Sequence, residues 1–447
     1  MGRRYYLVPM RTTLVAVTTA LTIALSPILS AATAQDTLPP EPPQPAVTAE
    51  NAETLEEQQD DGQPTTRERA PDTDDCPHLE SPATARTTSE AVVPGGRAPV
   101  LLPVPEVPAG GPLMANCGVI APEGFTLPEN QTASAWMVFD LDSGEILAAK
   151  DPHGRYRPAS IIKALIGLIA IEQLDPTQKV TGTWDAANIE GSRVGVGEGG
   201  EYTVDELLHG LLLASGNDAA YLLAQELGGD EATLEMVNER AREIGTEDTF
   251  VATYSGLDAP GMSTSAYDMA LIYQHAWKNP RFAQIVDTEF IDFPGWGDNE
   301  GFQVWNDNGL FMNDPDGIGG KTGYTDDANH TFVGALNREG RRIGAVILDT
   351  TIDKGRPWEQ ARELIDASLI TLPGAGVGQL GQPGGEQNTT PTQRPEPPVS
   401  PAPQAQDGGD GQDTTALDIA RVALPISTIV VLLLAALVWT FGRRRRG

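Results

Sequence analysis

Only one stretch of this 447-residue chain has the apolar patterning that a folded core requires, and it lies between two segments of low complexity. Residues 35–124 are acidic and rich in Pro, and residues 373–415 are rich in Gly, Pro and Gln. Segments of such composition bury too little apolar surface to offset the entropy of ordering the chain. We therefore predict disorder in 35–124, a semi-extended linker in 373–415, and one domain with a sizeable core in 125–372.

Each end of the chain carries an apolar run typical of membrane targeting. Residues 1–34 combine a basic start, an apolar stretch and a small-x-small ending, which together predict a signal peptide; an uncleaved anchor is the alternative. Residues 422–441 are long enough, at about 1.5 Å per residue, to cross a bilayer as a transmembrane helix. The basic tail of residues 442–447 would stay on the cytoplasmic side, so we expect the domain to lie outside the membrane and to be anchored to it.

Charge and cysteine content limit the partners and the compartment. The net charge of −32 argues against nucleic acid as a partner, because a phosphate backbone needs Lys and Arg to replace its counterions. Cys76 and Cys117 are the two cysteines, and an oxidising compartment permits a disulfide between them; two free thiols are the alternative. The five histidines lack metal-ligand spacing and no phosphate-binding glycine loop occurs, so neither metal nor cofactor is expected.

The order of predicted strands and helices indicates the fold class. Strand-like runs cover 135–141, 145–150, 320–325, 331–336 and 342–350. Helical patterns fill the middle of the domain, where Thr203 and Glu206 form a capping box, and a further helix over 358–369 ends it. This order predicts an α/β (α+β) fold in which an antiparallel sheet is flanked by helices and carries a helical subdomain.

One helix combines a serine and a lysine in an otherwise apolar surrounding. The helix that opens at Pro158 is apolar on nearly every face, which is typical of a buried helix, and Lys163 is the single charge in its apolar run. Ser160 lies three residues earlier, on the same face. A serine hydroxyl needs a base to become a nucleophile, and burial favours the neutral, basic form of a lysine. An N-cap serine followed by a lysine that reaches solvent is the structural alternative.

Two further motifs accompany this pair. Ser215-Gly216-Asn217 interrupts two predicted helices, and Lys321-Thr322-Gly323 lies on a predicted strand. Taken singly, the first is also typical of a helix–helix turn and the second of a protected sheet edge. In this order and in an exported chain, the three motifs together indicate a serine acyl-transfer site.

With these motifs and their flanks, the chain resembles the penicillin-recognising serine enzymes, most closely the low-molecular-mass D-alanyl-D-alanine carboxypeptidase family. The resemblance covers about residues 132–371, and the flanks that match lie within 157–163, 211–220, 264–270 and 316–325. It implies a β-lactamase/D,D-peptidase-like fold and an enzyme of the bacterial cell surface. Its substrates would be peptidoglycan stem peptides ending in D-Ala-D-Ala, and β-lactam antibiotics would acylate it.

The resemblance also implies the catalytic roles. Ser160 would attack the carbonyl between the two D-alanines, and Lys163 would take its proton. Ser215 would relay a proton to the leaving amine. Asn217 would hold Lys163 and the substrate amide.

The same resemblance assigns the substrate-binding residues to one strand. Lys321 and Thr322 would bind the terminal carboxylate through charge-assisted hydrogen bonds, and Gly323 would let the substrate approach the strand. The backbone N–H groups of Ser160 and Tyr324 would form the oxyanion hole.

One departure and two alternatives accompany this interpretation. Some family members carry an Arg within an N-x-N segment before the Lys-Thr-Gly strand, whereas Asp307 stands there in this chain, so carboxylate binding is expected to be weaker or to depend on Lys321. A class A-like β-lactamase would need a deacylating carboxylate, for which Glu190 and Glu198 are candidates. A non-catalytic wall-binding module is the other alternative.

Overall fold

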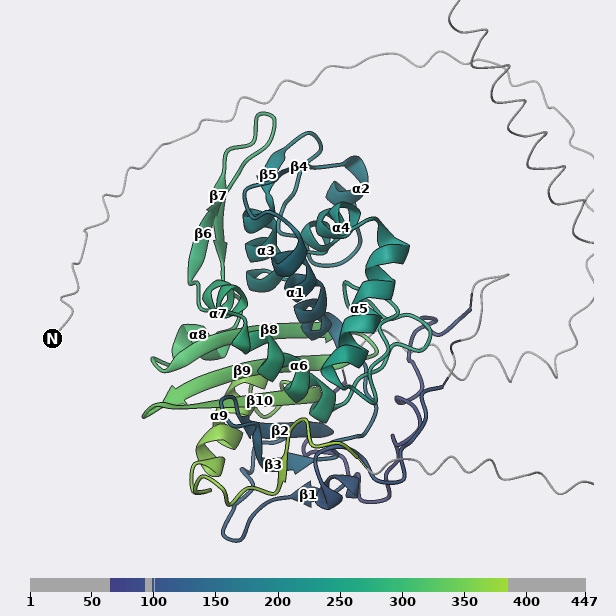
Figure 1. Cartoon of the computed structure of the whole chain (residues 1–447), viewed down its shortest axis with the longest axis vertical. Helices are drawn as coiled ribbons and strands as arrows, with labels where there is room; N and C mark the ends of the chain where they lie inside the picture. Colours follow the sequence, from purple (N-terminus) through teal and green to yellow (C-terminus); the bar gives the residue numbers. More distant parts are fainter. Residues whose placement is uncertain (1–64, 93–98, 100, 385–447) are drawn as a thin grey trace, which may run out of the picture.

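The computed structural model describes residues 65–92, 99 and 101–384, and its largest sheet is antiparallel with seven strands (Figure 1). The order is β1-β3-β2-β10-β9-β8, and β11 pairs with β3. Strands from the two ends of the domain thus meet at β2 and β10. The bounds are β1 (Val119–Ile120), β2 (Ala135–Asp140), β3 (Glu145–Lys150), β8 (Gly317–Thr325), β9 (Asn329–Arg338), β10 (Arg341–Thr350) and β11 (Gly378–Gln379).

Helices cover both faces of this sheet and build a second, helical layer beside β8 (Figure 1). They are η2 (Pro112–Ala115), η3 (Ala159–Ile162), α1 (Lys163–Gln173), α2 (Trp184–Ala187), α3 (Val204–Leu213), α4 (Asn217–Glu226), α5 (Asp230–Ile244), α6 (Ala266–Lys278), α7 (Pro280–Val286), α8 (Gly309–Asn313) and α9 (Pro357–Ser368). Two two-stranded antiparallel sheets lie in the helical part: β4 (Lys179–Thr181) with β5 (Glu201–Thr203), and β6 (Phe290–Phe293) with β7 (Phe302–Trp305). The predicted α/β class, with its helical subdomain, is confirmed.

Local sequence signals explain where the main helices begin and end. The Thr203 hydroxyl accepts from the Glu206 amide at 3.1 Å, and the Glu206 carboxylate accepts from the Thr203 amide at 2.7 Å, which is the predicted capping box at the start of α3. α6 begins after Ser265, whose hydroxyl caps the helix. α5 ends at Gly245, where a left-handed φ of 98° requires a residue without Cβ.

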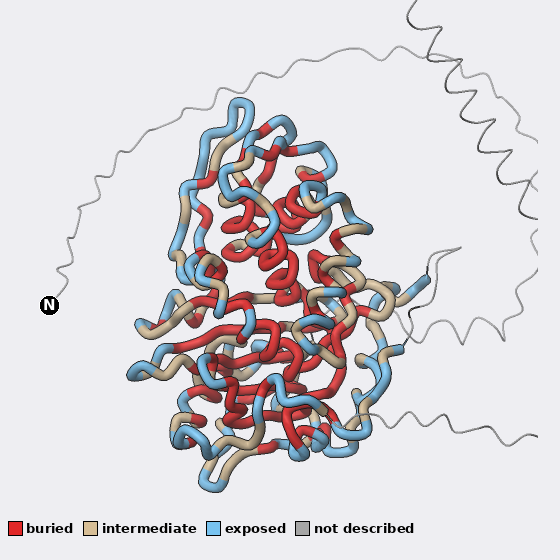
Figure 2. Tube along the Cα trace, in the orientation of Figure 1, coloured by how far each residue is buried: buried red, intermediate tan, exposed pale blue. Residues whose placement is uncertain are grey.

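The core lies on both faces of the sheet and continues around α1 (Figure 2). Along β2, Trp136 packs in the cluster that contains α9, and its neighbour Met137 packs in the cluster that contains α6, as the two-residue period of a strand requires. In α1 all residues from Lys163 to Ala170 are buried. Each buried Leu or Ile contributes roughly 1.5–3 kcal/mol, so α1 anchors the helical layer and fixes the position of η3 before it.

The predicted disorder of residues 35–124 is wrong for its described part. Residues 65–92 and 101–117, which we call the N-terminal strap, run along the domain, and the Cys76–Cys117 disulfide closes them into a loop. Met114 is almost fully buried. The strap has few apolar residues of its own, but its polar groups form hydrogen bonds with the domain. Amino-acid composition does not reveal the stability that these bonds contribute.

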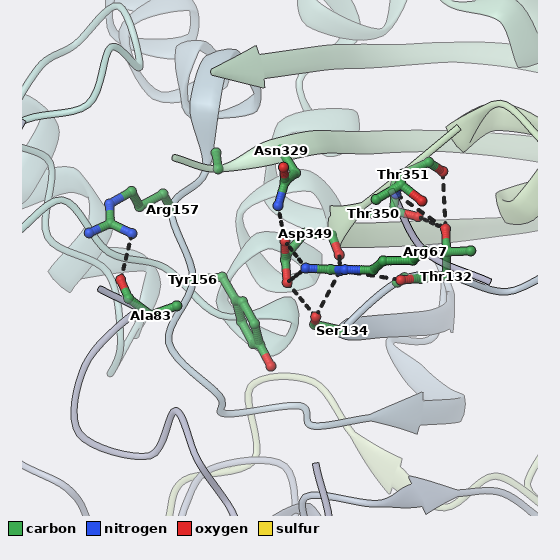
Figure 3. A network of polar contacts seen from close by, with 12 residues as sticks. Arg67, Ala83, Thr132, Ser134, Tyr156, Arg157, Asn329, Asp349, Thr350 and Thr351 are labelled. Atoms are coloured by element: carbon green, nitrogen blue, oxygen red, sulfur yellow. Dashed lines mark hydrogen bonds and ion pairs between the residues drawn. The ribbon is translucent and has the colours of Figure 1, made fainter. Parts of the chain in front are cut away.

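Arginine side chains make many of the bonds between strap and domain. The Arg67 guanidinium donates to both carboxylate oxygens of Asp349 at 2.9 Å and reaches the Ser134 hydroxyl (Figure 3). Arg157 donates to the Ala83 carbonyl at 2.9 Å, also drawn in Figure 3, and pairs with Glu90 at 2.7 Å. The Arg67 bonds tie the strap to the sheet, and the Arg157 bonds hold it beside the segment that leads into η3.

The boundary predicted for the C-terminal linker is also too early. Gly378 and Gln379 form β11, and Leu380 is buried, so the described residues 373–384 belong to the domain. The segments predicted as signal peptide (1–34) and transmembrane helix (422–441), like most of the linker, lie outside the described residues. Within the described part of the chain, no helix has the length and apolar character needed to cross a membrane.

Candidate active site

The predicted Ser–Lys pair comes together at the junction of η3 and α1. The side-chain nitrogen Nζ of Lys163 lies 2.8 Å from Ser160 Oγ, as their three-residue spacing on one helical face predicts. Ser160 is half-buried, and Lys163 has no exposed surface. The preceding residue, Ala159, has a left-handed φ of 49°, a conformation that costs of order 1 kcal/mol and that the surrounding packing must impose.

The surroundings of Lys163 favour its neutral form. Burial lowers its pKa well below the usual 10.5, and the nearby charge of Lys321 lowers it further. Asp307 and Asp218 act in the opposite direction. A neutral lysine within hydrogen-bond reach of a serine hydroxyl is a general base for that hydroxyl.

A second partner of Lys163 was not identified from sequence. Its Nζ donates to the Ser255 carbonyl, and Ser160 Oγ lies 3.5 Å from the same oxygen. The next residue, Gly256, has a φ of 85°, and a Cβ there would lie 2.1 Å from the Ala159 carbonyl oxygen. The only signal in the sequence was a Ser-Gly turn ahead of Leu257, and turns of that kind are common.

Strand β8 lies directly against Ser160, the predicted nucleophile. A Cβ added to Gly323 would lie 2.9 Å from the Ser160 backbone nitrogen, so a glycine is needed for this approach. The Thr331 hydroxyl on β9 donates to the Pro158 carbonyl at 2.8 Å and fastens the sheet to the start of η3. Tyr324, next on β8, is 44% exposed and its ring contacts His330. The two N–H groups predicted for an oxyanion hole therefore lie on adjoining segments.

The other two motif residues on β8 share a carboxylate neighbour. Lys321 is fully buried, its Nζ donates to the Thr322 carbonyl at 2.9 Å, and it lies 3.8 Å from Asp307 Oδ2. The Thr322 hydroxyl donates to the same Asp307 oxygen at 2.8 Å. Burial lowers the pKa of Lys321, and Asp307 counteracts this effect.

Ser215 lies between α3 and α4, Asn217 is the first residue of α4, and both are buried. Ser215 has a left-handed φ of 61°. The side-chain nitrogen of Asn217 donates to the Glu190 carbonyl at 2.7 Å, whereas the hydrogen bonds of Lys163 go to Ser160 and Ser255. The structure therefore does not pair Asn217 with Lys163 directly. Within the described chain, Asn217 Oδ1 is buried without a hydrogen-bond partner.

The carboxylates considered for a β-lactamase do not reach the pair. Glu190 and Glu198 are both exposed. Glu190 contributes its backbone carbonyl, rather than its carboxylate, to the contact with Asn217. A deacylating role for either side chain has no geometric support in the described part of the chain.

An antiparallel sheet whose edge strand carries Lys-Thr-Gly beside a serine paired with a buried lysine is the arrangement of a penicillin-binding serine peptidase. Solved structures show the same fold. The crystal structure of a D-alanyl-D-alanine carboxypeptidase from Mycobacterium tuberculosis H37Rv is 41% identical, with a TM-score of 0.55, and covers 58% of this chain and 100% of its own. The likeness in fold extends to lower sequence identity. A mutant of Streptomyces K15 DD-transpeptidase has a TM-score of 0.51 at 24% identity, and the match covers 53% of this chain and 98% of its own.

Sequence comparison identifies the family. Residues 124–351 match the D-alanyl-D-alanine carboxypeptidase family, Peptidase S11, and the chain belongs to it. The chain is 41% identical over 265 residues to D-alanyl-D-alanine carboxypeptidase DacB2 of Mycobacterium tuberculosis, covering 58% of this chain and 90% of that protein. It is 30% identical to DacF of Bacillus subtilis over 230 residues, covering 50% of this chain and 59% of DacF. The family resemblance inferred from the motifs is confirmed.

Proposed function

We propose that this chain removes the terminal D-alanine from peptidoglycan stem peptides through a covalent acyl-enzyme on Ser160. The observation that carries the proposal is the 2.8 Å contact between Ser160 Oγ and the fully buried Lys163 Nζ. Membership of the D-alanyl-D-alanine carboxypeptidase family supports the same reaction. Penicillins, which carry a strained amide beside a carboxylate, would acylate the same serine.

Acylation follows from the geometry of the pair. Neutral Lys163 takes the hydroxyl proton as Ser160 Oγ attacks the carbonyl carbon between the two D-alanines. The developing oxyanion would be stabilised by the backbone N–H groups of Ser160 and Tyr324, which lie on adjoining segments of η3 and β8. The helix dipole at the start of the η3–α1 run favours the same negative charge.

The helical layer would supply the remaining groups. The unpartnered Asn217 Oδ1 is an acceptor suited to a substrate amide N–H, because a buried acceptor without a partner costs roughly 1–3 kcal/mol until it is satisfied. Ser215 would pass the proton to the leaving amine of D-alanine. Water then attacks the acyl-enzyme, and Ser160 regains its proton.

We also propose that the enzyme works outside the bacterial cell membrane, with residues 1–34 as a signal peptide and residues 422–441 as its anchor. The Cys76–Cys117 disulfide supports an oxidising compartment. The apolar run and basic tail at the C-terminus support the anchor. Fractionation of cells expressing the full chain should place it in the membrane fraction with Gln35 as its first residue; recovery from the cytoplasm would contradict this.

Intact-mass spectrometry with benzylpenicillin tests the reaction. The full chain in detergent should gain the mass of one penicillin, and Ser160→Ala should not. Release of D-alanine from a pentapeptide would then establish the carboxypeptidase activity. Consumption of the drug without an adduct would favour a β-lactamase instead, and intact drug without an adduct would favour a binding module.

A further inference from the structure

A carboxylate of the protein itself lies beside the groups expected to bind the carboxylate of the substrate. Asp307 Oδ2 accepts from the Thr322 hydroxyl at 2.8 Å and lies 3.8 Å from Lys321 Nζ. Lys321 has no exposed side-chain surface, whereas that of Asp307 is 36% exposed. A ligand that reaches this part of the site therefore meets the negative group before the positive one.

Asp307 is held in this place by its own segment. Its backbone nitrogen donates to the Leu213 carbonyl at 2.9 Å, which ties it to the end of α3. The Asn306 side chain donates to the Val286 and Thr288 carbonyls, both at 3.0 Å.

The residue on the other side, Asn308, caps α8 through Leu310 and Phe311 and also donates to the Val333 carbonyl of β9 at 3.2 Å. Fixed on both sides, the Asp307 backbone cannot move away to make room for an anionic ligand without breaking several buried hydrogen bonds.

Lys321, Thr322 and Asp307 together form what we call the carboxylate subsite, and these contacts change what it can bind. The Thr322 hydroxyl donates its proton to Asp307. The hydroxyl oxygen can therefore act toward a ligand only as a hydrogen-bond acceptor. The Lys321 charge is already opposed by the Asp307 charge. A free carboxylate would be repelled by Asp307, whereas a carboxamide could donate an N–H to it and still accept from nearby donors.

We propose that Asp307 sets the specificity of this subsite: it weakens the binding of a free terminal carboxylate and admits leaving groups that carry a carboxamide in its place. This inference rests on the proposed peptidase function. With an amidated substrate the chemistry is unchanged. The amide bond between the two D-alanines breaks, Ser160 Oγ bonds to the acyl carbon, the proton from Ser160 goes to the amine of the departing D-alaninamide, and water hydrolyses the ester.

Two peptides that differ only in their end group test the proposal. One ends in D-Ala-D-Ala with a free carboxylate and the other in D-Ala-D-alaninamide, and kcat and KM are measured for both with the full chain in detergent. Asp307→Asn keeps the size and an acceptor oxygen but removes the charge. It should raise kcat/KM for the carboxylate peptide, relative to the amide peptide, by about tenfold, mainly through KM.

Asp298→Asn is the charge-matched control, because Asp298 is exposed in the loop between β6 and β7. It should leave the ratio unchanged. Asp307→Ser provides the same comparison if the Asn variant fails to give the thermal unfolding transition of the wild type.

The outcomes separate this inference from the function on which it rests. If both peptides are cleaved and their ratio is the same in wild type, Asp307→Asn and Asp307→Ser, the inference is overturned and the peptidase function stands. If wild type cleaves neither peptide and Ser160 forms no penicillin adduct, the proposed function fails and the inference fails with it.

Discussion

Lys163 has an ordinary side chain, and its chemistry comes from its surroundings. Burial is the largest cause of its lowered pKa, followed by the charge of Lys321. Sequence predicted the pair with Ser160 because a spacing of three residues on a helix is a local geometric property. It did not predict the Ser255 carbonyl, which is 92 residues away along the chain.

The rate of acylation should follow the titration of Lys163. Because the reactive form is neutral, the rate should rise with pH through a pKa well below the usual 10.5 and level off above it. Asp307 raises this pKa, so Asp307→Asn should move the midpoint to lower pH. Benzylpenicillin adduct formation, followed by intact mass over a range of pH, measures the midpoint. A midpoint near 10.5 would contradict the lowering of the Lys163 pKa by burial.

Gly323 is a residue at which a single added methyl group should affect acylation. In Gly323→Ala the Cβ would lie 2.3 Å from Thr331 Oγ1 and 2.9 Å from the Ser160 nitrogen, so β8 must move away from the nucleophile. We expect acylation to slow by at least about tenfold, which corresponds to about 1.4 kcal/mol. The same mass assay measures this rate.

Gly167→Ala in α1 is the matched control, because its Cβ would lie 3.4 Å from a Leu212 methyl group, an ordinary contact. It should retain acylation, since alanine is a better helix former than glycine. An unchanged rate in Gly323→Ala would contradict the close approach of β8 to Ser160.

At the scale of structural elements, the strap and the β8–β9 turn are joined through one carboxylate. Asp327 accepts from the backbone nitrogens of Arg86 and Thr87, at 2.7 and 2.9 Å, and from the hydroxyls of Thr87 and Ser89, both at 2.6 Å. The turn it belongs to follows Tyr324, and the strap also bonds Arg157 just before Ser160. The strap therefore braces both segments that form the predicted oxyanion hole.

Asp327→Ala should loosen this part of the strap. The amides of Arg86 and Thr87 lose their acceptor, so their hydrogen exchange should accelerate, with a loss of stability of about 1–3 kcal/mol. Hydrogen exchange read by mass spectrometry on peptides covering 80–92 measures the effect. Asp326→Ala is the neighbouring control. Equal exchange in both variants would mean that Asp327 does not hold the strap.

The same contact should depend on pH. Burial raises the pKa of Asp327, but the hydroxyl and amide donors outweigh burial and hold the pKa below its usual 3.8. A carboxyl group with a lowered folded-state pKa stabilises the folded state above its unfolded pKa. Protection of the Arg86 and Thr87 amides should therefore be complete at neutral pH and be lost as the pH falls through the lowered value. If protection of these amides instead increased on acidification, the lowered pKa of Asp327 would be contradicted.

Most elements of the domain were predictable because their signals are local. The capping box at Thr203 and the glycine stop at Gly245 act within one helical turn. The strands follow from alternation and turn residues. The strap was mistaken for disorder because its order comes from bonds to Asp349, Asp327 and Glu247 of the domain, rather than from apolar residues of its own.

At the scale of the whole molecule, the disulfide joins residues 41 apart and closes the strap against the start of the sheet. Its removal in a Cys76→Ser/Cys117→Ser variant should lower the free energy of unfolding by about 4 kcal/mol, through the entropy of the unfolded chain. Urea titrations with and without reductant measure this change. Penicillin acylation at room temperature should persist, since Ser160 and Lys163 do not contact the disulfide. Identical midpoints for variant and wild type would contradict a stabilising role.

The sequence by itself determined the chemistry and its local supports: a serine and a lysine on one helical face, a Lys-Thr-Gly strand, the helix caps and the positions of the main strands. Only the tertiary structure decided how these parts act on one another. It buried Lys163 beside Lys321, placed Asp307 on the Thr322 hydroxyl and laid the strap along the loop before Ser160. The reason is physical: caps and periodicity act over a few residues, whereas burial and charge depend on which distant segments the packed core brings together.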